Sequence, residues 1–208
     1  MDFDTLYDRV KKIDSDKLPG QESQFKMVPS IRPKISWEEV YETKPTLASV
    51  LLLVYPDGED NSKFVLIQRK EYNGAHSAQI SLPGGKLEED ENELEAALRE
   101  TYEEIGVDSG EIEVVTPLSK VWVSPSKFLV TPFLGILKEK PSFVKDSYEV
   151  EEIIEVNMTE FLDDTCICEE IVSSNYVQNL KVPAFRLGDR VVWGATAMIL
   201  SEFRDAVI

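Results

Sequence analysis

Residues 83–107 read PGGKLEEDENELEAALRETYEEIGV, and this stretch decides the fold. A Pro-Gly-Gly loop precedes a helix that we predict from about Asp90 to Ile105, where Gly106 ends it. Asp90 and Glu93 resemble a capping box at the start of this helix. Side chains that recur at helical spacing predict one buried face. They are Leu94, Leu98, Thr101 and Ile105.

Three glutamates lie on another face of the same predicted helix. Glu100, Glu103 and Glu104 stand at positions i, i+3 and i+4, so they are neighbours on the helix surface. A cluster of this kind usually forms a solvated acidic face, and this chain is rich in glutamate. Here, however, a glycine loop lies beside it, and glycine permits a tight turn and close backbone approach. Carboxylates held beside such a loop make an oxygen site that suits Mg²⁺.

The charge of the chain narrows the classes of partner. The 208 residues include 39 acidic and 22 basic ones, which gives a net charge of −17. A field of that sign repels nucleic acid and acidic membrane surfaces, so we expect neither as a partner. It would also repel a polyphosphate, unless divalent cations stand between the carboxylates and the phosphates. The charge therefore favours a metal-dependent enzyme over a nucleic-acid-binding protein.

The remaining composition is that of a globular protein. Hydrophobic residues make up 42% of the chain, and none of its apolar runs reaches the roughly 18 residues of a membrane helix. Residues 1–4 are acidic where a targeting signal would be basic, so we expect a cytoplasmic location. Cys166 and Cys168 are one residue apart, a spacing that is awkward for a disulfide and insufficient for a zinc site. We expect reduced, structural thiols.

The pattern of elements predicts an α/β layered domain with a mixed sheet. Two apolar runs joined by a Pro-Asp-Gly turn predict a β-hairpin. We expect residues 1–46 to form a helix and an irregular arm packed on the body, and residues 47–208 to form the domain. The expected helices cover 1–16, 158–162 and the chain from about 194. The expected strands cover 48–55, 63–69, 112–123, 128–137 and 153–156, with one or two more before about 186.

The spacing of residues in the opening stretch resembles the complete Nudix box. All seven fixed positions are present, and a chance match is expected about once in 10⁸ registers at ordinary residue usage. Thr101 stands at a hydrophobic position of the box, a departure that concerns packing. The seven matching residues are Gly85, Glu91, Arg99, Glu100, Glu103, Glu104 and Gly106.

The resemblance implies the Nudix fold, a mixed β-sheet sandwiched between helices, and a role for each residue of the box. Glu100, Glu103 and Glu104 would be the catalytic carboxylates and the ligands of two or three Mg²⁺ or Mn²⁺ ions. The carbonyl of Gly84 would be a further ligand. One of these carboxylates, or another from a nearby loop, would activate the attacking water, and which one does so stays open. The other matching residues would be structural: Gly85 and Gly106 at turns, and Glu91 with Arg99 as an ion pair that clamps the loop to the helix.

The segment upstream of the box resembles the coenzyme A diphosphatase branch of that family. Arg69, His76 and Gln79 match and would contact a nucleotide substrate similar to coenzyme A. Three positions of the same segment depart from the branch: Gly74, Ala78 and Leu82. The implied reaction is hydrolysis of coenzyme A or acyl-coenzyme A to 3′,5′-ADP and (acyl-)4′-phosphopantetheine.

Two other functions stay open at this point. One is a Nudix hydrolase for ADP-ribose, a dinucleotide or an oxidised nucleotide, and the other is a nucleotide-binding module without catalysis. The chain could act as a monomer or as a homodimer. Glu149 precedes a predicted strand, and a solvated charge is favoured there over a metal contact.

Overall fold

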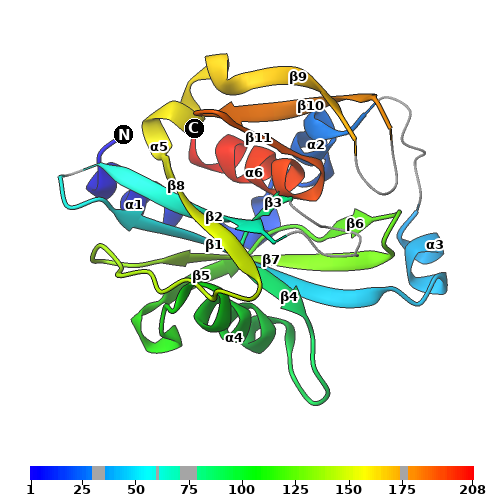
Figure 1. Cartoon of the computed structure of the whole chain (residues 1–208), viewed down its shortest axis with the longest axis horizontal. Helices are drawn as coiled ribbons and strands as arrows, with labels where there is room; N and C mark the ends of the chain where they lie inside the picture. The colour runs from blue at the N-terminus through cyan, green and yellow to red at the C-terminus, as the bar shows by residue number, and fades with distance from the viewer. Residues whose placement is uncertain (30–35, 60, 71–78, 174–177) are drawn as a thin grey trace.

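The structure, a computed structural model, describes residues 1–29, 36–59, 61–70, 79–173 and 178–208. Its centre is an eight-stranded mixed sheet, with helix α4 (Glu93–Ile105) on one face and helix α6 (Gly194–Val207) with a three-stranded sheet on the other (Figure 1). Strand β1 (Thr46–Pro56) runs parallel to β7 (Phe128–Ile136) and antiparallel to β2 (Ser62–Arg69). The predicted hairpin and mixed sheet are therefore both present.

Strand β1 is apolar along its length because the sheet is covered on both faces. Leu52 and Val54 belong to the core cluster that includes side chains of α6, whereas Leu51 and Leu53 belong to the cluster that includes side chains of α4. All four side chains are fully buried. The strand thus anchors α4 on one side of the sheet and α6 on the other.

The predicted single strand over 112–123 is wrong, because the chain forms two strands there. They are β5 (Glu113–Pro117) and β6 (Val121–Val123), and both pair with β7. Pro117 has no amide hydrogen to donate to a ladder, and the amide of Ser119 donates to the carboxylate of Glu202 in α6. The Leu118 amide still donates to the Pro132 carbonyl of β7 at 2.8 Å, so the pairing is interrupted at Ser119 and Lys120.

Three further strands of the main sheet pair with β1 or β2. Strand β4 (Gly84–Lys86) pairs with β1, and β3 (Ile80–Ser81) and β8 (Val150–Asn157) pair with β2. Strand β8 is longer than the predicted 153–156. Short helical segments lie at Ser109–Glu111 (η3) and Asp164–Cys166 (η4).

The second sheet contains three strands, where one or two were predicted. They are β9 (Ile167–Val172), β10 (Leu180–Leu187) and β11 (Arg190–Trp193), all antiparallel. Only Gly188 and Asp189 separate β10 from β11, and Gly188 has a left-handed φ of 60°, as tight hairpin turns require. Helices α5 (Met158–Leu162) and α6 (Gly194–Val207) occupy the predicted positions.

The N-terminal part is more helical than predicted. Helix α1 (Phe3–Val10) is shorter than expected, and the arm expected to be irregular contains helices α2 (Gln21–Gln24) and α3 (Trp37–Glu42). Ser36 and Glu39 form a capping box that starts α3. The arm also contains two 3₁₀ turns, η1 (Ser15–Lys17) and η2 (Phe25–Met27).

The N-terminal segment packs against the C-terminal helix. Glu202 in α6 is fully buried, and its carboxylate accepts hydrogen bonds from the Gly20 amide at 3.2 Å and the Gln24 side chain at 3.1 Å. Leu6 and Val10 of α1 are fully buried in the same core cluster as α6. Among the described residues, none of the helices has the length and apolarity needed to cross a membrane.

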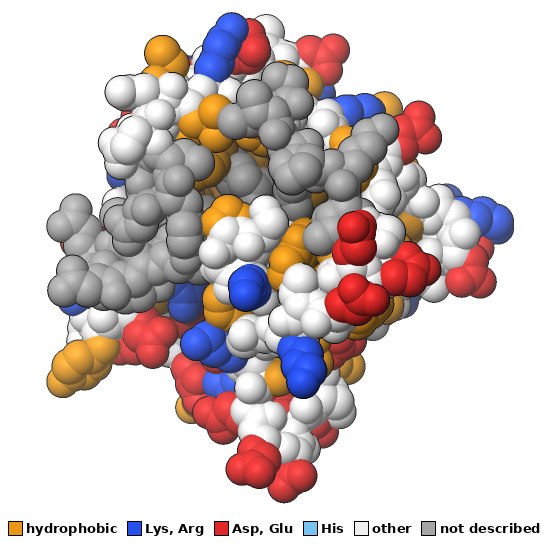
Figure 2. Space-filling model, turned by 90° about the vertical axis from the view of Figure 1, so that its right-hand side faces the viewer, with side chains coloured by type: hydrophobic (Ala, Val, Ile, Leu, Met, Phe, Trp, Pro, Cys, Tyr) orange, Lys and Arg blue, Asp and Glu red, His pale blue; other side chains and the backbone are white. Residues whose placement is uncertain are grey.

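Cys166 and Cys168 are both free, and Cys166 is buried. On the face shown in Figure 2, Lys and Arg side chains are intermixed with Asp and Glu side chains, and the residues drawn in colour form no continuous basic patch.

Candidate active site

Helix α4 (Glu93–Ile105) begins later than predicted. The Asn92 side chain caps it by accepting hydrogen bonds from the amides of Leu94 and Glu95, and the Glu95 side chain accepts a bond from the Asn92 amide in return. The capping box expected at Asp90 is therefore wrong. Asp90 has a φ of 67°, a left-handed conformation that a helix cannot contain. The helix ends as predicted, with Gly106 in the left-handed region at a φ of 74°.

The buried face of α4 differs in part from the predicted one. Thr101 and Ile105 are fully buried as expected, whereas Leu94 and Leu98 are only half-buried, and the small Ala97 is fully buried. The Thr101 hydroxyl donates to the Ala97 carbonyl at 2.7 Å, so its polar atom is satisfied inside the core. Small residues thus bring α4 close to the sheet.

The loop before α4 requires glycine at two positions. Gly84 has a φ of +147°, and a Cβ there would lie 2.2 Å from the Ser49 carbonyl oxygen and 2.5 Å from the Val50 Cα. A Cβ on Gly85 would lie 2.2 Å from the Glu100 carboxylate. The absence of side chains therefore lets this backbone lie directly against two of the predicted ligands, since the Gly84 amide also donates to Glu104 Oε2 at 2.8 Å.

Glu104 is a buried carboxylate with an unsatisfied oxygen. Its side chain is 2% exposed, and burial raises its pKa to about 8, although the Arg69 charge and the Gly84 amide act in the opposite direction. Glu104 Oε1 lies 2.9 Å from Arg69 Nη2, but it accepts no aligned hydrogen bond from the described residues. A buried carboxylate with an oxygen that accepts no aligned hydrogen bond suits a cation ligand better than a structural role.

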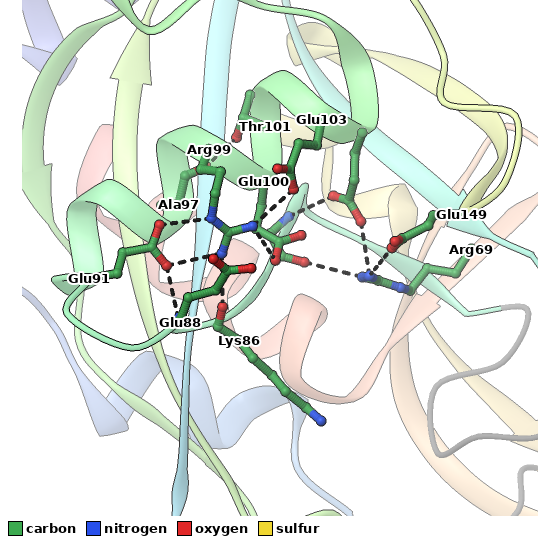
Figure 3. A network of polar contacts seen from close by, with 12 residues as sticks. Arg69, Lys86, Glu88, Glu91, Ala97, Arg99, Glu100, Thr101, Glu103 and Glu149 are labelled. Atoms are coloured by element: carbon green, nitrogen blue, oxygen red, sulfur yellow. Dashed lines mark hydrogen bonds and ion pairs between the residues drawn. The ribbon is translucent and has the colours of Figure 1, made fainter.

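Arg99 connects the loop, the helix and two of the glutamates (Figure 3). Its Nε and Nη2 form the predicted ion pair with Glu91, at 2.8 and 3.0 Å. Its Nη1 lies 3.0 Å from Glu100 Oε1 and 2.9 Å from Glu103 Oε2, and its Nη2 donates to the Lys86 carbonyl at 3.1 Å. One guanidinium therefore fixes the loop to the helix and also neutralises two predicted ligands.

The three carboxylates beside Arg99 differ in their surroundings. The hydrogen bond from Arg99 holds the pKa of Glu91 below its usual value. Burial raises the pKa of Glu100, and Arg99 offsets this only in part. Glu103 is more open to solvent, with 55% of its side chain exposed. The three candidate carboxylates thus differ in exposure: Glu104 is buried, Glu100 is half-buried and Glu103 is exposed.

Arg69 lies opposite Arg99, at the end of β2. Its Nη1 donates to the Gly84 carbonyl at 3.2 Å, and its Nη2 lies 3.7 Å from Glu149 Oε2. Glu149 precedes β8, and its side chain is 61% exposed. The sequence favoured a solvated charge at Glu149, and the pairing of β8 with β2 that brings it to Arg69 cannot be read from local sequence.

The other predicted substrate residues are placed only in part. The carbonyl of Gln79 accepts a hydrogen bond from the Arg69 amide at 3.0 Å, so its backbone lies next to the site. Leu82, one of the departures from the coenzyme A diphosphatase branch, is buried in the core. His76 lies outside the described residues, as do Gly74 and Ala78.

The residues present fit a divalent cation. In the conformation seen, the described part of the chain has no group of three or more His, Cys, Asp or Glu side chains arranged to hold a metal ion. The guanidiniums of Arg69 and Arg99 lie between the candidate ligands instead. The donors are all oxygen atoms, one of them buried without an aligned hydrogen bond, and this set suits Mg²⁺ or Mn²⁺.

Comparison with known proteins places the site in a family. Residues 45–165 match the family described as NUDIX domain. The chain is 34% identical over 163 residues to Nudix hydrolase 15, mitochondrial, from Arabidopsis thaliana, covering 76% of this chain and 57% of the relative. It is 31% identical over 120 residues to the peroxisomal coenzyme A diphosphatase ndx-8 from Caenorhabditis elegans, covering 57% of this chain and 51% of the relative. The chain thus spans about half the length of these relatives.

A solved structure shares the fold. The MutT/nudix family protein from Enterococcus faecalis superposes with a TM-score of 0.55 at 20% identity, covering 85% of this chain and 64% of that protein. The expected α/β arrangement, a mixed sheet between helices, is confirmed by this likeness and by the family match.

Proposed function

Since the chain belongs to the Nudix family, we propose that it hydrolyses the phosphoanhydride bond between two phosphates of a nucleoside-diphosphate derivative. The observation that carries this proposal is the Glu104 carboxylate, which is buried against the Gly84 loop with one oxygen free of aligned hydrogen bonds. A fold that retained only nucleotide binding would have no use for this buried charge, because burial of a carboxylate is costly.

Glu100, Glu103, Glu104 and the Gly84 carbonyl would hold the Mg²⁺ or Mn²⁺ ions. When bound, such ions neutralise the diphosphate and make a water molecule more acidic. The chain itself positions these ligands, through the Arg99 network and the two glycines of the loop. In the reaction the oxygen of water bonds to phosphorus, the bridging P–O bond breaks, and a carboxylate takes the proton from the water. Glu103 and Glu149 lie near these ligands, and more than half of each side chain is exposed.

For the substrate we propose coenzyme A or an acyl derivative, with 3′,5′-ADP and (acyl-)4′-phosphopantetheine as products. Two observations support this choice. Arg69 of the upstream segment lies at the candidate ligands, and the coenzyme A diphosphatase from C. elegans is among the relatives. The other relative described above has the general name Nudix hydrolase.

A substrate panel with Mg²⁺ tests both levels of the proposal. Coenzyme A, acetyl-coenzyme A, ADP-ribose, a dinucleoside polyphosphate and an oxidised nucleoside triphosphate are incubated with the protein, and the products are identified by mass spectrometry. We expect 3′,5′-ADP from both coenzyme A substrates at the highest kcat/KM, and no products from the Glu104→Gln variant. A preference for ADP-ribose would overturn the substrate, and inactivity toward the whole panel would overturn the hydrolase.

Location and assembly stay predictions. The names of the relatives give mitochondrial and peroxisomal addresses for those proteins, whereas the sequence of this chain predicts a cytoplasmic one. Microscopy of the tagged chain tests the location, and light scattering in solution distinguishes a monomer from a homodimer.

A further inference from the structure

Among the described residues, the guanidinium of Arg69 contacts only oxygen atoms that could bind a cation. Its Nη1 donates to the Gly84 carbonyl at 3.2 Å, and its Nη2 lies 2.9 Å from Glu104 Oε1. Its third partner is Glu149, 3.7 Å away (Figure 3). Two of the four proposed metal ligands are therefore held by one guanidinium, on the side of the site opposite Arg99.

Arg99 differs from Arg69 in its attachment. Besides Glu100 and Glu103, Arg99 holds Glu91 through two nitrogen atoms and also donates to the Lys86 carbonyl. It would remain attached to the loop if Glu100 and Glu103 turned away to another cation. Arg69 has no such second anchor among the contacts seen for its guanidinium, and the strand that carries it has a bulge between Gln68 and Arg69. Bulges commonly redirect a side chain next to an active site.

A metal ion and the Arg69 guanidinium would compete for the same oxygens, and their positive charges would repel each other. Mg²⁺ binds its oxygen ligands at about 2.1 Å, so an ion held by Gly84 and Glu104 would lie within a few ångströms of the guanidinium nitrogens. Arginine keeps its positive charge in proteins. The side chain must therefore move away, because it cannot escape the repulsion by losing a proton.

We propose that Arg69 is a stand-in cation, which keeps Gly84 and Glu104 in place without metal and is released when the metal binds. This inference rests on the proposed metal-dependent function. Once released, the guanidinium is free on the side of Glu149, where it can bind a phosphate oxygen of the substrate. Arginine suits this second task because its planar fork matches phosphate geometry. Arg69 would thus pair with Glu104 when the metal is absent and with a substrate phosphate when the metal is bound.

The test is the affinity for Mn²⁺ alone, measured by titration calorimetry on the full chain. Arg69→Gln removes the competing cation, so we expect Mn²⁺ to bind about five- to thirtyfold more tightly, the range of an ordinary coupling between two sites. Arg190→Gln is the matched control. Arg190 bonds the neighbouring Gln68 at 3.1 Å and Glu152 at 2.7 Å, and its loss changes the net charge equally without touching a proposed ligand. We expect less than a twofold change for the control.

Thermal unfolding gives a readout that is independent of binding and activity. In EDTA, Arg69→Gln should lower Tm relative to the wild type, because Glu104 loses its counter-charge, and saturating Mn²⁺ should remove the difference. Arg69→Lys keeps the charge but offers one nitrogen atom instead of the two that a guanidinium presents. Its Mn²⁺ affinity should therefore lie between that of the wild type and that of Arg69→Gln. This variant keeps the test valid if Arg69→Gln folds poorly.

The outcomes separate this inference from the proposed function. If the wild type binds Mn²⁺ but Arg69→Gln binds it more weakly, or no more tightly than Arg190→Gln, then Arg69 is scaffolding and the stand-in role is wrong, while the hydrolase proposal stands. If the wild type binds no Mn²⁺, both fail together. If Arg69→Gln binds Mn²⁺ more tightly than the wild type and has a lower Tm in EDTA, the stand-in role of Arg69 is supported.

Discussion

The amide of Gly84 donates a 2.8 Å hydrogen bond to Oε2 of Glu104, a carboxylate that lies twenty residues later and is 2% exposed. This bond joins the glycine loop at residues 83–85 to the last turn of α4. Only a residue without a side chain fits at Gly84, because a Cβ would collide with the backbone of β1. The loop and the carboxylate are therefore fixed relative to each other before any ligand binds, which is the preorganisation that catalysis by positioned charge requires.

Replacing Glu104 with Gln should abolish most of the activity without unfolding the protein. The change preserves size but removes the charge, so kcat should fall by about two orders of magnitude or more, as for the loss of one preorganised group. In EDTA at pH 8 the variant should be at least as stable as the wild type, since it no longer buries a carboxylate that can ionise. Steady-state kinetics and thermal unfolding measure the two effects. Near-normal turnover with normal metal binding would favour the binding-module alternative.

Removal of metal should stop the reaction reversibly. The candidate ligands are all oxygen atoms, so activity should need roughly millimolar Mg²⁺ or micromolar Mn²⁺. Treatment with EDTA should eliminate turnover while the circular dichroism spectrum stays native, and adding Mg²⁺ back should restore it. Full activity after chelation and dialysis is the result that this mechanism does not survive.

Gly85→Ala tests the close approach between the loop and Glu100. The new Cβ would lie 2.2 Å from the Glu100 carboxylate, which is the far end of a flexible side chain and can turn aside. We therefore expect Tm to change little, while Mn²⁺ affinity and kcat both fall because Glu100 is displaced. Gly84→Ala is the contrast, because there the obstacle is backbone and stability itself should drop. Unchanged metal affinity in Gly85→Ala would argue against Glu100 as a ligand.

The stability of the protein should fall in acid partly through Glu113. Hydrogen bonds from Lys11 and Lys138 lower its pKa from 4.5 to about 2. A carboxyl group whose pKa is depressed by folding stabilises the folded state above its unfolded pKa, and this contribution disappears as the pH falls toward the folded value. The Tm difference between the wild type and Glu113→Gln should thus be constant above pH 5 and shrink between about pH 4.5 and 2. A constant difference down to pH 2.5 would show that these pairs contribute nothing.

Replacement of His76 or Gln79 with Ala tests the substrate. Leaving a buried polar group without its hydrogen-bond partner costs about 1–3 kcal/mol, so the ratio of kcat/KM for coenzyme A to that for ADP-ribose should fall by roughly five- to a hundredfold. Kinetics with both substrates on each variant gives the ratio. An equal decrease for both substrates would mean that this segment supports the loop instead of reading the ligand.

The sequence predicted well those features that depend on long, regular patterns. The central hairpin, helix α4 with its Gly106 end and the terminal helix all follow such a pattern, although the buried face of α4 was predicted only in part. The ion pair between Glu91 and Arg99 was also expected, although these residues lie eight positions apart. In each case the partners are close in the chain or are fixed by a box of known spacing.

The features that the sequence did not predict depend on competition between two candidate helix caps or on pairing between strands that are far apart in the chain. Asp90 and Asn92 are both good caps, and the left-handed conformation of Asp90 decided between them. Leu98 was expected in the core but is only half-buried, so the Leu98→Ala change should cost less than the 2–5 kcal/mol or so of a buried leucine. Glu149 reaches Arg69 only because β8 pairs with β2, an interaction between segments about eighty residues apart.

The buried Glu202 also constrains how the chain is made. Its hydrogen-bond partners are Gly20, Gln24 and Ser119. The last helix therefore completes contacts with the N-terminal arm and with the middle of the chain. A ribosome produces these segments in order, and the N-terminal arm must wait without its docking partner until α6 has been synthesised. The central sheet is likewise open on the α6 side during that time. The final stage of folding therefore comes only after α6 has been synthesised, and the apolar surface exposed until then is where a chaperone would bind.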